Sequence, residues 1–197
     1  MEVNLQGNKL GDYALIELCD ALTDNDSITK LNLSKNLLTN KAAELIGKML
    51  QENNSLEELY LSWNQIKGQG GIALFEGMKV RSQIKVLDLS WNSLGLYNSP
   101  FAQYFADYIS KDKALVHLDL SNNYFTKSAA ITISKALEQN HTLYGLHFQG
   151  NVGYIDPKGF LVIPEGYAQD ISVQVLSPQL KGNNLSIITH KINCVRF

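Results

Sequence analysis

Two histidines and two aspartates, which are residue types that can bind a metal or transfer protons, lie in three similar short segments of this sequence. Asp88 lies in the segment LDLSWN, His117 and Asp119 lie in HLDLSNN, and His147 lies in LHFQGN. Imidazole and carboxylate groups coordinate metals and act as general acids or bases. Whether these four groups can act together depends on the elements that hold them.

The three segments belong to a repeat that is marked by apolar residues at a period of 28 residues. The marking residues are Leu5, Leu33, Leu61, Leu89, Leu120 and Phe148, with one longer step before Leu120. An asparagine follows each of them three positions later, namely Asn8, Asn36, Asn64, Asn92, Asn123 and Asn151. A period of this length with the pattern L-x-x-L-x-L-x-x-N-x-L is typical of leucine-rich repeats.

The six asparagines have a structural explanation. Each one follows the last apolar position of a predicted strand, where the chain turns and its backbone groups are enclosed between repeats and need partners. An asparagine side chain carries both a donor and an acceptor, so it can bond the backbone of neighbouring loops. We therefore predict a ladder of structural asparagines rather than a set of ligand-binding residues.

Helical periodicity follows the strand segments. In residues 42–50 and 129–137, apolar residues recur at the spacing of one helix face. A strand that is followed by a helix and then by a parallel strand requires a right-handed crossover. The sequence thus predicts an α/β fold: a right-handed leucine-rich repeat solenoid, or horseshoe, with a parallel concave sheet and convex helices. This solenoid would span residues 1–151 in about six repeats of 28–31 residues, the first of them incomplete.

Units of this length with a full helix resemble the ribonuclease-inhibitor class of leucine-rich repeats, over residues 1–151. The string LYLSWNQIKGQGGIALFEGM, with its Trp-Asn pair, is similar to cytoplasmic and ciliary leucine-rich repeat proteins. That resemblance implies a non-enzymatic scaffold that binds other proteins in the cytoplasm, in a cytoskeletal or ciliary assembly. Ran GTPase activators have a similar repeat type, so a GTPase-activating module is the alternative function, although their acidic tail is missing here.

The composition excludes several function classes. A net charge of −2, with Arg81 and Arg196 as the only arginines, gives no electrostatic footprint for nucleic acid or an anionic membrane. The sequence has no apolar run long enough to span a membrane and no glycine-rich phosphate loop, and we expect no cofactor. Cys19 and Cys194 form no spaced disulfide framework, so a reducing intracellular setting is expected.

The metal-type residues fall on the concave face of the predicted sheet. In each repeat, one residue lies between the two apolar residues of the L-x-L part of the motif. This position holds Tyr60, Asp88, Asp119 and His147, and His117 stands two residues before Asp119. Because neighbouring strands are about 4.8 Å apart, these side chains should form one row. A row on an open sheet has no pocket that removes water from its groups. We therefore predict that it binds a partner protein and is neither a catalytic nor a metal site.

Trp63 and Trp91 occupy the same position of consecutive repeats, directly before the ladder asparagine. They should stack one repeat apart, at the edge where the strand turns into a loop. Two indoles on a solvent-tolerant surface are typical anchors of a protein interface. Packing between the loops of neighbouring repeats explains the pair equally well, and both explanations stay open at this point.

The fourth repeat is three residues longer than its neighbours and carries an aromatic helix. Pro100 stands near the start of this helix, which is a favoured position for proline. Phe105 falls on the core phase of the helix, whereas Tyr104 falls on a partly exposed phase. The aromatic side chains of residues 101–108 therefore either fill the core, which we favour, or anchor a partner on the convex face.

Both ends of the array depart from the repeat. The first repeat has Val3 and Leu5 but lacks the apolar residue expected before them, and no capping segment precedes it. Residues 152–197 lose the helical period and keep short apolar runs, so we expect a β-rich cap or, preferably, a partner-binding arm. Uncovered ends expose core and strand edges. The chain is therefore expected to be part of a larger complex or a fragment of a longer chain.

Overall fold

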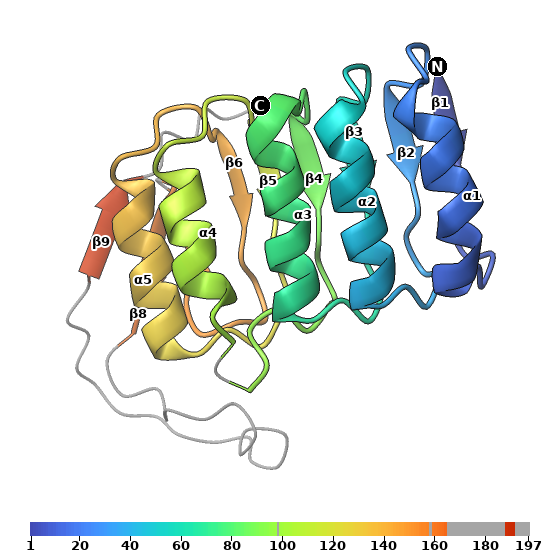
Figure 1. The fold of residues 1–197 in the computed structure, drawn as a ribbon. Coiled ribbons are helices and arrows are strands. Elements are labelled where there is room, and N and C mark those ends of the chain that lie inside the picture. Colours follow the sequence, from blue (N-terminus) through green and yellow to red (C-terminus); the bar gives the residue numbers. More distant parts are fainter. Residues whose placement is uncertain (98, 158, 165–187, 192–197) are drawn as a thin grey trace.

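The computed structural model describes residues 1–97, 99–157, 159–164 and 188–191. Its main body is a sheet of six parallel strands that alternate with helices along the chain. Figure 1 shows the helices side by side along one face of this sheet. The predicted α/β leucine-rich repeat solenoid is therefore confirmed. We refer to the sheet face that carries no helices as the concave face.

The strands of this sheet are short and follow one another in chain order. They are β1 (Glu2–Asn4), β2 (Lys30–Asn32), β3 (Glu58–Tyr60), β4 (Val86–Asp88), β5 (His117–Asp119) and β6 (Gly145–His147). The helices are α1 (Gly11–Thr23), α2 (Asn40–Glu52), α3 (Gly68–Arg81), α4 (Phe101–Ile109) and α5 (Lys127–Leu137). Equal positions of successive repeats therefore stand next to each other.

The ladder leucines explain why the strands form at these places. Leu59, Leu87 and Leu118 are paired neighbours in the sheet and are fully buried against the helices. Because side chains alternate along a strand, the residues on either side of each leucine face the concave side. The same alternation therefore builds the core and sets out a row of surface side chains.

Two of the helices begin at a threonine that supplies a hydrogen-bond acceptor. The Thr39 hydroxyl accepts from the backbone N–H of Lys41 at the start of α2, and the Thr126 hydroxyl accepts from that of Ala129 at the start of α5. The first N–H groups of a helix have no partner within the helix, so such caps fix where it begins. The position of each threonine therefore sets the length of the loop that leads from the preceding strand to α2 or α5.

The aromatic helix α4 packs into the core. Phe101 and Phe105 are fully buried and Tyr108 is 7% exposed, whereas Tyr104 is partly exposed and donates its hydroxyl to Glu76 of α3. The favoured explanation for this helix, that its rings fill the core, agrees with this burial. The rings on the core phase therefore cannot anchor a partner on the convex face.

The chain after the last repeat forms a second, antiparallel sheet. Its strands are β7 (Tyr154–Ile155), β8 (Phe160–Ile163) and β9 (Ile188–Lys191). Leu161 and Ile163 of β8 are buried in the common core. Residues 165–187 and 192–197 lie outside the described residues, and so do Cys194 and most of the segment to which the choice between a cap and an arm applies.

Candidate interaction surface

The ladder asparagines bond each loop to the backbone of its neighbours. The Asn64 side-chain oxygen accepts from the backbone N–H groups of Asn36 and Leu38, both at 3.0 Å. Its amide nitrogen donates to the carbonyls of Leu33 and Leu61 at 3.1 and 2.9 Å. Donation to loop carbonyls recurs at Asn8, Asn36, Asn92, Asn123 and Asn151.

Tyr60, Asp88, Asp119 and His147 lie in one row on the concave face. They are the last residues of strands β3 to β6, and the parallel register pairs each with the next. The first three side chains are half-buried and His147 is exposed. The row therefore offers a phenol, two carboxylates and an imidazole to anything that lies along the sheet.

The two aspartates of the row also hold the turns that follow their strands. Asp88 Oδ1 accepts from the backbone N–H of Ser90 at 2.9 Å and from its hydroxyl at 2.7 Å. Asp119 Oδ1 accepts from the backbone N–H of Ser121 at 2.8 Å. Both serines are buried under these contacts. Each aspartate thus has a structural role in addition to the charge that it places on the concave face.

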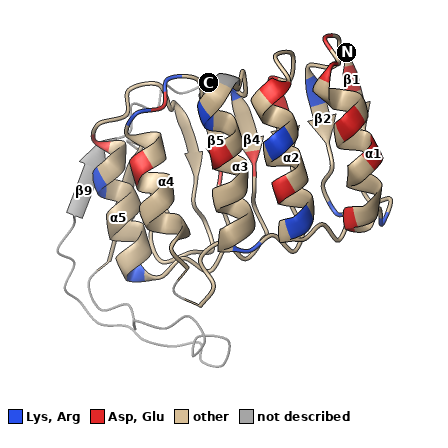
Figure 2. Cartoon of the chain, viewed as in Figure 1, with Lys and Arg blue, Asp and Glu red and all other residues tan. Residues whose placement is uncertain are grey.

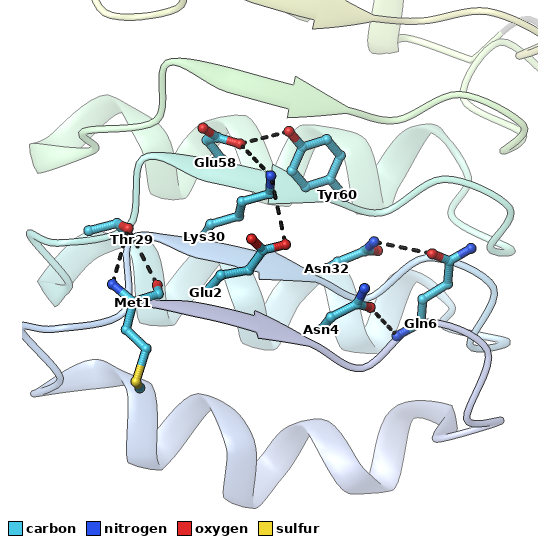
Figure 3. Close-up of polar contacts among 9 residues, drawn as sticks. All are labelled: Met1, Glu2, Asn4, Gln6, Thr29, Lys30, Asn32, Glu58 and Tyr60. Atoms are coloured by element: carbon cyan, nitrogen blue, oxygen red, sulfur yellow. Dashed lines mark hydrogen bonds and ion pairs between the residues drawn. The ribbon is translucent and has the colours of Figure 1, made fainter.

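A charged network that the sequence analysis did not single out lies beside the row, on strands β1 to β3. Lys30 Nζ stands 3.7 Å from a carboxylate oxygen of Glu2 and 3.4 Å from one of Glu58. The Tyr60 hydroxyl donates to Glu58 at 2.7 Å, as Figure 3 shows. Burial, followed by this bond to a carboxylate, raises the pKa of Tyr60 to about 12.

The sequence contained a signal for this network. Glu2, Lys30 and Glu58 hold the same position of three successive repeats, where parallel register makes them neighbours. Opposite charges on adjacent strands attract each other across the sheet. Reading each repeat position as a column of charges would therefore have predicted the ion pairs that connect these three strands.

His117 and His147 form a close pair at the other end of the row. Their ring centroids are 4.9 Å apart. Gly145 makes room for the His117 ring, because a Cβ atom there would lie only 2.3 Å from His117 Nδ1. Burial, and next the neighbouring His147, lower the pKa of His117, while Asp119 and Asp88 oppose that shift. The fold therefore favours the neutral form of His117.

Trp63 and Trp91 stack face to face where strands β3 and β4 turn into their loops. Their ring centroids are 4.2 Å apart and the rings are inclined by 11°. The two side chains remain 50% and 46% exposed. Lys35 Nζ lies 5.8 Å from the centroid of the Trp63 ring, within the range of a cation–π contact. The rings therefore contact each other and remain available at the surface.

Comparison with known proteins agrees with the repeat and the fold. A family model described as leucine-rich repeat matches residues 52–75, and a second of the same description matches residues 114–135. This chain is a leucine-rich repeat protein. No curated protein sequence matches it.

Two solved structures are similar to this leucine-rich repeat protein in fold. The C-terminal domain of tropomodulin from Caenorhabditis elegans has a TM-score of 0.60 at 18% identity, over 71% of this chain and 83% of that one. A structure described as leiomodin-1 actin-binding site 2 has a TM-score of 0.49 at 19% identity, over 75% of this chain and 69% of that one. At this level of identity the likeness concerns the fold alone.

The described part of this leucine-rich repeat protein holds no group of three or more His, Cys, Asp or Glu side chains that could bind a metal ion. None of its described helices is long and apolar enough to cross a membrane. A hollow of about 740 Å³ lies between the ends of α3 and α4 and is lined by Met78, Tyr108 and Ala114 among others. The concave row therefore lies apart from that hollow, on the open sheet.

Proposed function

We propose that this chain is a non-enzymatic scaffold that binds another protein through its concave face. The observation that carries this proposal is the row of Tyr60, Asp88, Asp119 and His147, held in register on four adjacent strands. Rigid repeats keep such side chains at fixed spacings, which favours recognition of an extended partner surface. The open face does not enclose a substrate, and enzymes need an enclosed, water-poor site for most chemistry.

The side-chain types of this surface suit a protein partner. Trp63, Trp91 and Tyr60 combine apolar rings with polar atoms, and residues of this kind are enriched among the energetic centres of protein interfaces. His117 joins the surface beside His147 and adds a second imidazole. The partner-binding set is thus Tyr60, Trp63, Asp88, Trp91, His117, Asp119 and His147.

A cytoskeletal setting is the more specific part of the proposal. It is supported by the resemblance of the Trp-Asn repeat strings to cytoplasmic and ciliary leucine-rich repeat proteins. The tropomodulin domain adds a solved structure with the same fold. Actin filaments and microtubules are therefore suitable defined partners for a first co-sedimentation test, because each can be purified and pelleted alone.

The concave face is tested by comparing two double variants in pull-downs from lysate, read by quantitative mass spectrometry. Tyr60→Ala/His147→Ala removes two side chains of the row that are not needed for the turns after their strands. Tyr13→Ala/Glu44→Ala is the matched control, because both residues are exposed on the helices α1 and α2. We expect the row variant to lose at least one protein that the control variant retains. Truncating interface side chains of this kind often costs about 2 kcal/mol of binding.

The contrary outcomes are equally clear. If both variants retain the same proteins with equal intensity while their melting temperatures match the parent chain, the concave face is not the binding surface. If the chain instead accelerates GTP hydrolysis by a small GTPase in that lysate, the GTPase-activating alternative replaces the scaffold function. A hydrolysis assay with and without the chain provides that second measurement.

A further inference from the structure

The two edges of the repeat array carry different charges. We define the strand-to-helix rim as the described residues of the loops that lead from each strand to the next helix, namely residues 5–10, 33–39, 61–67, 89–97, 99–100 and 120–126. These loops contain three lysines and no aspartate or glutamate. The opposite, helix-to-strand loops also contain three lysines, Lys85, Lys111 and Lys113, but these are outnumbered by five acidic residues: Asp24, Asp26, Glu57, Asp112 and Glu138. Figure 2 shows both charge types on this edge.

The rim also exposes large apolar side chains. Trp63 and Trp91 are about half exposed, and so are Leu37 and Tyr124, which stand one residue after the ladder asparagine in neighbouring loops. Tyr97, in the longer loop of repeat four, is 86% exposed. Water is a poor environment for such surface, and a gathering of apolar residues rimmed by polar ones marks an interaction site.

The backbone shows that the fold does not require indoles at this edge. The residue before the ladder asparagine has a positive φ throughout: 75° at Gly7 and Gly150, 55° at Trp63 and 54° at Trp91. Glycine adopts this left-handed conformation freely, whereas a large residue is disfavoured there. A glycine therefore serves the turn at least as well as tryptophan. Residues in such conformations gather at functional sites, and the turn alone does not account for the indoles.

We infer that the strand-to-helix rim binds an acidic, apolar segment of a partner protein, an inference that rests on the proposed scaffold function. Lys35 stands over the outer face of Trp63, and Lys9 and Lys67 lie on the neighbouring loops, where their side chains are exposed. Carboxylates of the segment pair with these ammonium groups, and its apolar side chains pack against the Trp63–Trp91 stack. The loops of the other edge have a net negative charge despite their three lysines, so the difference in net charge favours binding of the segment at the rim.

Single-stranded nucleic acid would also meet lysines and aromatic rings, but the geometry disfavours it. Bases bind by stacking on free aromatic faces. The facing sides of Trp63 and Trp91 cover each other at 4.2 Å, and Lys35 lies over the outer side of Trp63. The rings therefore present mainly their edges, which suit apolar side chains and carboxylates better than bases.

The rim can be tested directly because Trp63 and Trp91 are the only tryptophans of the chain. Selective excitation of indole therefore reports on this stack alone. The probe is a short synthetic peptide of alternating aspartate and leucine, without tryptophan. We expect a saturable change of indole emission that weakens with added salt. The same peptide with lysine in place of each aspartate is expected to give no saturable change.

Two variants assign the binding to the rim lysines. Lys35→Gln/Lys67→Gln removes two charges from the rim, whereas Lys48→Gln/Lys111→Gln removes two exposed charges elsewhere. We expect the first variant to bind the acidic peptide about fivefold more weakly, as two exposed ion pairs allow, and the second to match the parent chain. Equal affinity of the two variants would overturn the inference. So would saturable quenching by oligo-deoxythymidine without any response to the acidic peptide.

This inference can fail while the scaffold function stands. If Tyr60→Ala/His147→Ala loses the lysate partner but Lys35→Gln/Lys67→Gln retains it and the acidic peptide is not bound, the concave face binds the partner and the rim does not. Loss of that partner from the rim variant, with retention by Lys48→Gln/Lys111→Gln, supports both proposals together.

Discussion

The helix layer packs in two different ways on the two sides of α3. Helix α3 packs against α2 backbone to backbone, since a Cβ atom added at Gly77 of α3 would lie 2.0 Å from the carbonyl oxygen of Gly47 in α2. Against α4 it packs through rings, because the Phe75 centroid lies 5.2 Å from that of Phe105 and 4.9 Å from that of Tyr108. One interface is set by the absence of side chains and the other by the largest ones.

The difference follows from the longer fourth repeat. Its helix α4 has 9 residues, whereas α3 has 14. The rings fill part of the wider space, and the remaining space opens as the hollow lined by Met78, Tyr108 and Ala114. The sheet register and the asparagine ladder continue across both interfaces. Irregularity is therefore confined to the helices and to the longer loop between β4 and α4, and the concave face stays continuous.

The largest effect is expected where the two interfaces are alike, in the asparagine ladder. Asn64→Leu leaves two buried N–H groups and two carbonyls without the bonds that Asn64 supplies. Asn123→Leu removes a similar set beyond the fourth repeat. Because each orphaned buried group costs about 1–3 kcal/mol, we expect each variant to lose about 4 kcal/mol of unfolding free energy in urea titrations.

Asn8→Leu is the control for the ladder, since Asn8 lies in the exposed first loop. It should lose far less stability than the two buried positions. If Asn123→Leu is as mild as Asn8→Leu while Asn64→Leu is severe, the ladder does not act alike on both sides of α3. The loops on the two sides of α3 would then differ in stability, as the helix interfaces differ in packing.

The next largest effect separates the two helix interfaces. Gly77→Leu forces a side chain between backbones that are already in contact, so we expect a loss of about 3 kcal/mol, at the upper end of overpacking. Ala114→Leu adds similar bulk beside α4 but extends into the hollow, and should change stability by less than about 1 kcal/mol. Thermal and urea unfolding of the two variants provide the measurement. Equal losses would show that the hollow is no more tolerant than the glycine contact.

Much of the fold could be predicted from the sequence because the period alone fixes it. Each repeat has to bury the same leucines, and a strand followed by a helix leaves only a parallel sheet with helices on one face. The row of Tyr60, Asp88, Asp119 and His147 follows from that register without further information. The prediction that this row binds a partner is untested and remains a proposal.

Other features were not predicted, either because they depend on neighbours in three dimensions or because their signal lies in a whole column of repeat positions. The left-handed backbone at Trp63 and Trp91 is not a tryptophan preference, and its signal in the sequence is the glycine at the same position of other repeats, Gly7 and Gly150. The contact of Gly47 with Gly77 requires the crossing point of two helices, which periodicity does not give. The ion pairs of Lys30 with Glu2 and Glu58 can be predicted only if charged residues as well as apolar residues are compared between repeats.

The smallest effect on stability is expected on the concave face, which continues unchanged across both helix interfaces. Burial and His147 lower the pKa of His117 from its ordinary value near 6.5, so the unfolded chain binds a proton more readily than the folded one. Stability from this group is therefore fully present above about pH 6.5 and decreases as the pH falls below that value. His117→Gln should flatten this part of the pH profile of urea midpoints, and His141→Gln, at an exposed loop residue, is the control for losing an imidazole elsewhere. If His117→Gln keeps the parent slope, the close imidazole pair does not bias the protonation of His117, and the concave face has the same stability in either charge state.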